Sequence, residues 1–503
     1  MIKKNVLPSN WFLTTIGEIG IVMSGGTPST KKTEYFGGEV SWITPTDLSK
    51  YTNKFISEGK RNITIEGLNN SSAKLLPKGT VLFSSRAPIG YTAIAQKELS
   101  TNQGFKNLVT TKSLNSEYVY YYFKTLKPLA EKIASGTTFL ELSAQKFSKL
   151  PFPLPPLNEQ IKIVNRINEL FIIFEHQEKE INNILKKLEI YKYSFLHKIF
   201  TKKSNSRKII KIKDLGNILT GSTPTKSDSN LYGMKYNFYK PSDFNWGDKI
   251  SKSNEMLSNE GYLTSKKVPV NSILVTCIGT IGKVSLVKKE GAFNQQINAI
   301  IPSDEFIPEF IFYQVLSLDF QQLIKENTSA TTIPIINKTK FSELDFIYYS
   351  LDEQKTTTQE IESKFSIIDN LEYTVQQLME KLKLTKIKIL DNAFKGKLIS
   401  IEESQESAKL LFEKIQNEKK EYLKEKKNEL KKQPKKGKTV NKDLSILEIV
   451  KKSDNGVLAK DLFLQSKYNN NIEEFYSELK KIEDKIVIEN NNKDSLIRIK
   501  NEN

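Results

Sequence analysis

The sequence predicts an α+β fold with two copies of an α/β globule. Two long antiparallel helices, which form a coiled coil, separate the two copies. A C-terminal helix and a small winged-helix-like domain follow. Three observations predict this fold: the chain repeats itself after about 194 residues, each copy ends in a long stretch without Pro or Gly, and the last hundred residues belong to neither copy. At 503 residues, the chain is too long for one hydrophobic core, since a domain usually holds about 100–200 residues.

The repeat consists of segments that recur in the same order. They are Gly25–Ser29 with Gly221–Thr225, Trp42–Leu48 with Phe238–Phe244, Val81–Ser84 with Ile273–Thr276, Leu157–Gln160 with Leu351–Gln354, and Phe200 with Phe394. Each match is short, but the ordered set indicates a duplication. The globules, residues 1–157 and 204–351, contain β-branched or aromatic runs broken by Gly, Pro and Asn, with helical stretches between them, which predicts a mixed α/β fold.

Residues 158–203 and 352–400 are expected to form the two long helices. Their apolar residues recur three and four positions apart, and Asn158 and Asp352 are the expected N-caps. Forty-odd residues make a rod of roughly 60 Å. The row of apolar residues along each rod must be buried against another surface, and the equivalent row of the other copy is the nearest one. We therefore expect an antiparallel pair with a pseudo-twofold axis, which holds the globules at a fixed distance.

The rest of the chain is an addition to the duplication. Residues 401–440 are expected to form a Lys/Glu-laced helix and a basic linker. Residues 441–503 show three short helical patterns and a hairpin pattern, which is the winged-helix order. The charge of this domain is close to neutral, so protein docking, dimerisation and DNA contact all remain open.

Composition narrows the class of function. A net charge of +18 and a pI near 9.3 favour a polyanionic partner. One cysteine, Cys277, cannot form an intrachain disulfide, and with only His176 and His197 the chain offers no His/Cys zinc cluster. No apolar run of about 18 residues and no signal peptide are found, so we expect a cytoplasmic protein without a membrane partner.

Taken together, these segments resemble the specificity subunit of a type I restriction-modification system over about residues 5–400. The resemblance depends on the order of five motifs: Leu13–Ile19, the Ser24–Pro28 loop, Thr44–Leu48, the Pro153–Gln160 helix start and the Ala393–Leu398 helix end. The second copy departs from the pattern at Lys240–Phe244 and at Ile347–Ser350.

The resemblance implies a function and a set of partners. In that family each globule is a target-recognition domain that reads one half of a bipartite DNA site. The helices are spacers and docking surfaces for two methyltransferase subunits, and restriction-translocase subunits join for cleavage. The resemblance thus implies a non-catalytic chain that binds double-stranded DNA. It implies no cofactor or metal on this chain, with S-adenosylmethionine, ATP and Mg²⁺ on the partner subunits.

Base reading needs Arg or Lys for guanine, Asn or Gln for adenine, and Ser or Thr as adaptable donors. The first globule offers Thr27, Thr44, Ser85, Arg86, Asn102, Gln103, Lys106, Thr137 and Thr138. The second globule offers Thr223, Lys226, Lys240, Thr276, Lys283, Asn294, Gln295, Gln296, Thr331 and Thr332. We expect the DNA contacts to come from these residues.

Plainer interpretations stand beside these. Gly25–Pro28 is a turn motif first, Asn102 could satisfy loop backbone, and Arg86 could serve a salt bridge. Asp47 and Asp243 are interpreted as turn-capping acids and not as catalytic ones. The second hypothesis is a stand-alone nuclease or methyltransferase, but the sequence lacks the motifs of these enzymes. The third hypothesis is a protein-binding scaffold.

Overall fold

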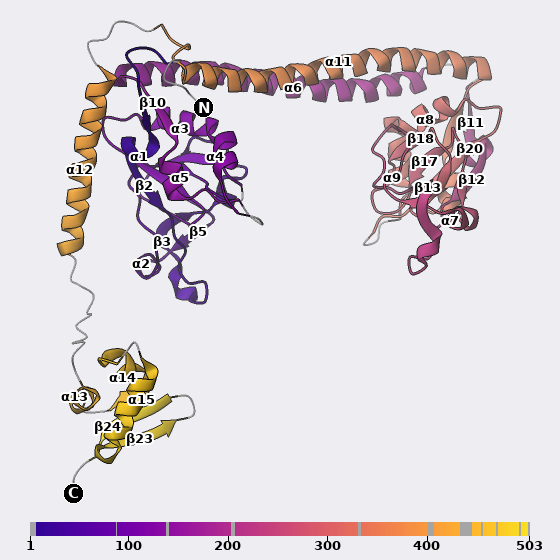
Figure 1. Ribbon diagram of the computed structural model, residues 1–503. Coiled ribbons are helices and arrows are strands. Elements are labelled where there is room, and N and C mark those ends of the chain that lie inside the picture. The colour runs from indigo at the N-terminus through magenta and orange to yellow at the C-terminus, as the bar shows by residue number, and fades with distance from the viewer. Residues whose placement is uncertain are drawn as a thin grey trace.

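The computed structural model describes residues 7–86, 88–136, 140–202, 207–329, 333–400, 407–432, 445–453, 456–468, 471–491 and 494–500. Figure 1 shows two globules that lie apart, on the same side of one long two-helix rod and near its opposite ends. This arrangement confirms the predicted fold class. Within the described residues, no helix is long and apolar enough to cross a membrane.

The first globule contains a five-stranded sheet and a three-stranded sheet. The larger sheet has the order β2 (Gly20–Ser24), β9 (Lys106–Thr110), β6 (Val81–Phe83), β7 (Thr92–Ala95) and β4 (Phe55–Ile56). The smaller has the order β5 (Arg61–Ile63), β3 (Phe36–Ile43) and β8 (Ser100–Thr101). The helices are α1 (Ile16–Ile19), α2 (Ile65–Asn69), α3 (Ser116–Thr125), α4 (Lys127–Ile133) and α5 (Ala144–Ser148).

The second globule repeats this topology. Its five-stranded sheet has the order β12 (Gly216–Thr220), β20 (Ile297–Pro302), β17 (Ile273–Thr276), β18 (Val284–Val287) and β14 (Asp248–Ile250). The other sheet has the order β15 (Met256–Leu257), β13 (Tyr232–Tyr239), β19 (Gly291–Phe293) and β16 (Lys267–Val268). The helices are α7 (Asn259–Thr264), α8 (Pro308–Leu316), α9 (Leu318–Glu326) and α10 (Lys338–Ser342).

A short antiparallel strand pair closes each globule beside the rod. In the first copy β1 (Phe12–Thr15) pairs with β10 (Pro151–Leu154), and in the second β11 (Lys208–Lys211) pairs with β21 (Asp345–Tyr348). The last strand of each pair runs into a long helix within a few residues. Each globule is therefore held on the rod by both of its ends.

The rod consists of α6 (Leu157–Thr201) and α11 (Leu351–Ala393), which pack side by side in opposite directions. Ion pairs join the helices, and two of them are equivalent: Lys192 Nζ lies 2.9 Å from Glu372 Oε2, and Lys386 Nζ lies 2.8 Å from Glu178 Oε1. Both the lysines and the glutamates are 194 residues apart in the sequence. The two contacts are therefore the same contact made twice, as a pseudo-twofold axis requires.

Each long helix ends in the core of the other globule. Leu196 and Phe200 of α6 are buried in the core of the second globule, where Phe200 lies 5.6 Å from Phe310 between ring centroids. Leu390 of α11 and the C-cap residue Phe394 are buried in the core of the first globule. The predicted match between Phe200 and Phe394 is thus a match in packing as well.

Both predicted N-caps are wrong by two residues. Asn158 lies inside α6, where its Oδ1 accepts from the Glu159 backbone N–H at 2.7 Å, and Pro156 is the N-cap. For α11 the N-cap is Ser350, whose hydroxyl donates to Glu353 Oε2 at 2.9 Å in a capping box. The Pro run before α6 and the competing Ser–Glu pair explain the shift.

The C-terminal addition has two parts. Helix α12 (Ala408–Lys432) lies against the first globule. The last part has the order α13 (Ile446–Lys451), β22 (Val457–Leu458), α14 (Ala459–Gln465), α15 (Ile472–Lys481), β23 (Ile486–Asn491) and β24 (Asp494–Ile499). The hairpin is joined by β22, a two-residue strand that the sequence pattern did not predict. The order agrees with the winged-helix-like prediction.

Candidate nucleic-acid interface

The Gly-Xaa-Thr-Pro loop and the Asn-Gln loop lie together in each globule. Thr27 Oγ1 contacts Gln103 Oε1 in the first copy, and Thr223 Oγ1 contacts Gln295 Oε1 in the second. The glycine that begins each motif permits this approach. A Cβ on Gly25 would lie 1.9 Å from the carbonyl oxygen of the Asn-Gln loop, and the corresponding distance at Gly221 is 2.2 Å. The motif therefore builds a two-loop surface on which Gln103, Gln295 and Thr223 are exposed and Thr27 is half-buried.

The asparagines of these loops have a backbone role. Asn102 Oδ1 accepts from the Gly104 N–H at 2.9 Å, and Asn294 Oδ1 accepts from the Gln296 N–H at 3.1 Å. Each asparagine thus closes an Asx turn that shapes its loop. Gln103 and Gln295 are exposed at the loop tips.

Asp47 and Asp243 are turn-capping acids, as interpreted from the sequence. Asp47 Oδ2 accepts from the Thr44 N–H and hydroxyl at 2.8 and 2.6 Å. Asp243 Oδ2 accepts from the Lys240 N–H at 2.7 Å. Their other oxygens accept from the backbone N–H of Lys60 and of Asn254, both at 3.0 Å. Both carboxylates are therefore engaged in shaping the loop at the end of β3 or β13.

In the first globule these loops border a basic hollow of about 440 Å³, lined by Trp42, Thr44, Pro45, Thr46, Asp47, Lys60, Arg61, Arg86 and Asn102. Arg61 lies over the ring of Phe36, with Cζ 4.3 Å from the ring centroid. Arg86 Nη1 lies 3.9 Å from Glu141 Oε2, so the salt bridge considered for Arg86 is present at long range. Three cationic side chains thus face one solvent-open hollow, an arrangement suited to phosphates and guanine edges.

Lys60, Arg61 and Thr46 were not among the predicted contacts. Lys60-Arg61 is a basic dipeptide that directly follows Gly59 and begins a strand. A basic pair at a turn–strand boundary was the available signal. The sequence could not show that β5 places this pair next to the end of β3.

The second globule holds different side chains at the same places. Asn254 takes the place of Lys60, because each donates its backbone N–H to the capping aspartate. Ile278 bridges to Ile335 where Arg86 bridges to Glu141. Lys240 forms an ion pair with Glu255 and lies over a ring with Nζ 5.4 Å from the Phe238 centroid. The two globules share a backbone and present different chemistry on it.

Several predicted contacts are buried and have a structural role. Ser85 donates to the Gly104 carbonyl at 3.1 Å, and Thr276 donates to the Thr280 carbonyl at 2.5 Å. Lys106 is buried beside Glu141, with Nζ 3.5 Å from Oε1; burial lowers the pKa of Lys106, and the Glu141 charge offsets this only in part. These buried groups cannot reach a base edge in this conformation.

The remaining predicted contacts are distributed as follows. Lys283 Nζ donates to the carbonyls of Pro241 and Phe244 at 3.1 and 3.2 Å, and Asn294 is buried. Lys226 is exposed. Thr137, Thr138, Thr331 and Thr332 lie outside the described residues.

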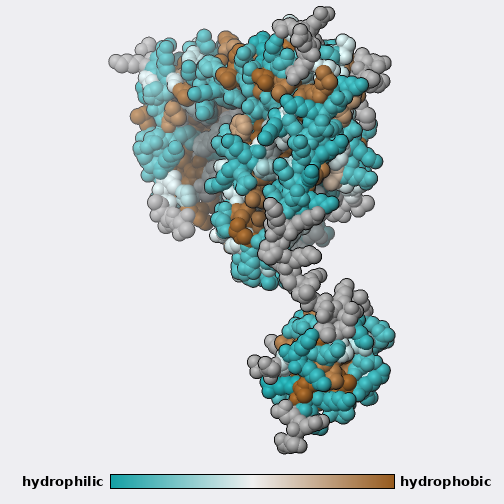
Figure 2. Space-filling model, turned by 90° about the vertical axis from the view of Figure 1, so that its left-hand side faces the viewer, coloured by the Kyte–Doolittle hydropathy of each residue, from teal (hydrophilic) through white to brown (hydrophobic). Residues whose placement is uncertain are grey.

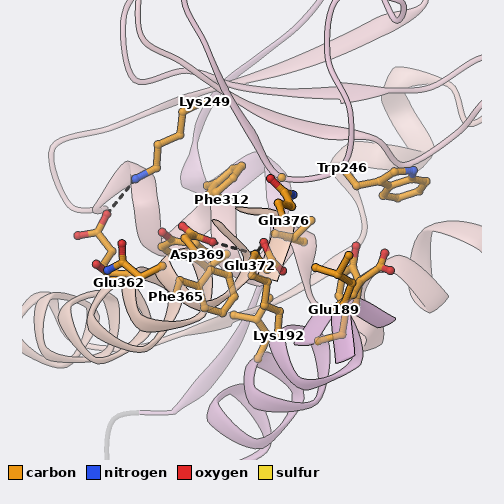
Figure 3. A pocket seen from close by; sticks show the side chains of 18 residues that line it. Glu189, Lys192, Trp246, Lys249, Phe312, Glu362, Phe365, Asp369, Glu372 and Gln376 are labelled. Carbon is orange, nitrogen blue, oxygen red and sulfur yellow. Dashed lines mark hydrogen bonds and ion pairs between the residues drawn. The ribbon is translucent and has the colours of Figure 1, made fainter. Parts of the chain in front are cut away.

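A second hollow, of about 750 Å³, lies where the second globule meets the rod (Figure 3). Lys192 Nζ lies 2.8 Å from Asp369 Oδ1, and Lys249 Nζ lies 3.2 Å from Glu362 Oε1. Its charged lining has more acids than bases: Glu189, Glu362, Asp369 and Glu372 against Lys192 and Lys249. This acidic hollow would repel a phosphate backbone, so it is not part of the candidate interface.

Comparison with known proteins identifies relatives for both copies. The family model for the type I restriction modification DNA specificity domain matches residues 8–187 and again residues 206–384. The MjaIX specificity subunit of Methanocaldococcus jannaschii is 43% identical over 194 residues, which cover 38% of this chain and 45% of that protein. The HindI specificity subunit of Haemophilus influenzae is 33% identical over 184 residues, covering 36% and 38%. The chain thus spans less than half the length of these two relatives.

Longer matches are more distant. The MjaVIII specificity subunit of M. jannaschii is 20% identical over 78% of this chain and 94% of its own length. A solved chain from a type I R-M system, described for its complex assembly and conformational transition, superposes with a TM-score of 0.62 at 18% identity. The match covers 78% of this chain and 99% of the solved chain, so the likeness extends over the whole of that fold.

Proposed function

The chain belongs to the type I restriction-modification DNA specificity family, and from this premise we propose that it reads a bipartite DNA site with its two globules. One observation carries the proposal: two equivalent loop surfaces, each built from a Gly-Xaa-Thr-Pro loop and an Asn-Gln loop, are bordered by different side chains at equivalent backbone positions, Lys60 and Arg86 in the first globule and Asn254 and Ile278 in the second. Two globules with the same loop backbone and different side chains suit two half-sites of different sequence.

The energetics of reading two half-sites support this function. A well-placed bidentate contact discriminates against a wrong base by about 1–3 kcal/mol, and costs at separate positions add roughly. A few base pairs read by each globule therefore sum to a selectivity that neither globule has alone. The net charge of +18 supplies the sequence-independent attraction to phosphates.

We propose that two methyltransferase subunits dock on the rod and that restriction-translocase subunits join them in the cytoplasm. Exposed apolar residues recur on both helices at positions 194 residues apart: Ile173 with Ile367, Ile184 with Leu378, and Ile190 with Leu384. A two-helix rod leaves these side chains in water, and their pseudo-twofold arrangement fits two copies of one partner. S-adenosylmethionine, ATP and Mg²⁺ would then act on those partners, and this chain would be non-catalytic.

The experiment combines this chain with its methyltransferase partner. Methylation mapping in cells that express both should give one sequence made of two half-sites, and footprinting of the purified complex on that sequence should give two protected patches. Methylation or cleavage by the purified chain alone, with S-adenosylmethionine and Mg²⁺, would favour the enzyme hypothesis. Absence of any protected patch in the presence of the partner would favour a protein scaffold.

A further inference from the structure

Helix α12 is fixed to the first globule by an apolar contact. Leu411 and Ile415 are buried in the core of that globule. The rings of Phe12 and Phe412 lie 4.9 Å apart between centroids. A side of α12 is therefore part of the globule's own hydrophobic core.

Polar contacts set the position of α12 along the globule. Glu418 accepts from the Ser113 N–H at 3.0 Å and from the Ser113 hydroxyl at 2.6 Å. Gln416 Nε2 donates to the Glu18 carbonyl at 2.7 Å, and Lys419 Nζ donates to the Gly17 carbonyl. These specific contacts fix the rotation of α12 about its own axis, so the side of the helix opposite the contacts faces away from the globule.

That opposite side carries a row of lysines. Lys420, Lys424 and Lys427 are spaced at i, i+4 and i+7, which places them on one face, and all three are exposed. Among the residues that the structure describes, no carboxylate forms an ion pair with them, whereas neighbouring Lys426 pairs with Glu429 at 2.8 Å. We call Lys420, Lys424 and Lys427 the lysine row.

The lysine row lies at the outer end of the molecule. In Figure 1, α12 runs along the side of the first globule that faces away from the second globule. Figure 2 views the molecule from this side and shows mostly hydrophilic surface there. A duplex that runs along the line from the second globule to the first, and continues in that direction, leaves on this side. The row is therefore next to the flank of the first half-site.

The second globule is different. Its strand β11 corresponds to β1, yet no helix of the described chain covers it, and Ile209 is 68% exposed there. The family match also ends at residue 384, before α12 begins. The lysine row thus breaks the symmetry of the two copies.

We propose that the lysine row binds the sugar-phosphate backbone of the DNA that flanks the first half-site, which rests on the proposed function above. Unpaired ammonium groups on a fixed helix attract phosphates without reading bases. The row thus lengthens the DNA contact on one side only. It adds affinity and leaves the sequence preference unchanged.

The test uses the full chain in complex with its methyltransferase partner and a duplex that carries the mapped site. The triple variant Lys420→Gln, Lys424→Gln, Lys427→Gln keeps helix-forming side chains. It should shorten the footprint on the flank of the first half-site and leave the flank of the second unchanged. The log–log salt slope should fall by about 0.9 for each lost phosphate contact, so by about 2.7 for three.

Two controls accompany this variant. Trimming the duplex on the first flank should weaken wild-type binding and leave the triple variant unaffected, whereas trimming the second flank should affect both proteins equally. A matched variant, Lys289→Gln, Lys325→Gln, Lys338→Gln, removes the same charge from exposed positions of the second globule, and not from the rod, and should leave the first flank protected.

The outcomes separate the two proposals. Equal flank protection and an unchanged salt slope in the triple variant, with specific binding intact, would overturn the role of the lysine row alone. If wild-type protein with its partner shows no sequence-specific protection, the proposed function itself is wrong.

Discussion

At the scale of single residues, the two globules keep the side chains that build loops and change those that face the hollow. Asp47 and Asp243 cap equivalent turns, and Asn102 and Asn294 close equivalent Asx turns. By contrast, the bridge that joins Arg86 to Glu141 in the first copy joins two isoleucines in the second. A loop frame can thus be reused while the side chains beside it change, because backbone capping depends on a few short polar side chains.

A substitution of Arg61 tests the distinction between side chains that build the loops and side chains that face the hollow. We expect Arg61→Ala to reduce binding to the cognate site by about 1–3 kcal/mol and to relax the base preference at a position in the first half-site only. The side chain borders the basic hollow and lies over Phe36, so its loss removes a positioned guanidinium without opening the core. Binding to a set of single-base variants of the site measures both effects.

Lys78 provides the control for Arg61. It is an exposed lysine in the turn before β6, and it does not line the basic hollow. Lys78→Ala should leave the base preference unchanged. A changed preference in the second half-site after Arg61→Ala would contradict the assignment of the hollow to the first.

At the scale of elements, the long helices are bound to the globules through their ends. Phe394 lies 5.2 Å from Tyr118 and 5.0 Å from Tyr122 between ring centroids, in edge-to-face geometry. It follows α11 and is buried in the core of the first globule. A globule and the end of the helix that started at the other globule are therefore one packing unit.

This packing predicts a large effect of Phe394→Ala. We expect the free energy of unfolding of the first globule to fall by about 3–5 kcal/mol, because a buried ring is replaced by a cavity. Hydrogen exchange, resolved by globule, should show faster exchange in the first globule and little change in the second. Tyr373→Ala, at an exposed position of α11, should change stability by less than about 0.5 kcal/mol.

The docking of α12 should depend on pH through Glu418. Burial disfavours the charged form, but the hydrogen bonds from the Ser113 hydroxyl and backbone N–H outweigh it, so the pKa of Glu418 is lowered from 4.5. A lowered pKa in the folded state stabilises docking above pH 4.5, and this stabilisation is lost as the pH falls through the folded value. Urea unfolding should therefore show a larger difference between wild type and Glu418→Gln at pH 7 than at pH 3.5.

At the scale of the whole molecule, the duplication produces a symmetric spacer. The ion pairs Lys192–Glu372 and Lys386–Glu178 are equivalent by the repeat, and the two helix ends enter the two cores in the same way. The distance between the globules is thus determined by the length of the rod and not by contact between them. Helix α12 and the winged-helix-like domain are added at one end only.

A change in rod length should therefore change the spacing of the half-sites. Insertion of four residues into both helices, after Leu185 and after Met379, lengthens the rod by about 6 Å. Since base pairs repeat every 3.4 Å or so, we expect the preferred gap to change by about two base pairs, with the same bases read. Insertion of four residues between 432 and 445 is the control and should leave the gap unchanged. Altered bases in either half-site would contradict a passive spacer.

The sequence by itself determined the number and order of the parts. The repeated motifs indicate the duplication. The apolar period, which extends over more than forty residues without Pro or Gly, indicates the rod. Both are properties of the chain in one dimension. Asp47 and Asp243 could also be interpreted as turn caps and not as catalytic acids, because no nuclease motif accompanies them and such caps bind backbone a few residues away.

Only the tertiary structure decided which polar side chains face solvent. Ser85 follows β6 closely and Thr276 ends β17, and the fold buries both, whereas Lys60 and Arg61 come to line the hollow because β5 pairs with β3. The same holds for β22, which is only two residues long and exists through its pairing with β24. Exposure and short pairings depend on contacts between segments far apart in the chain, and no local pattern records these contacts.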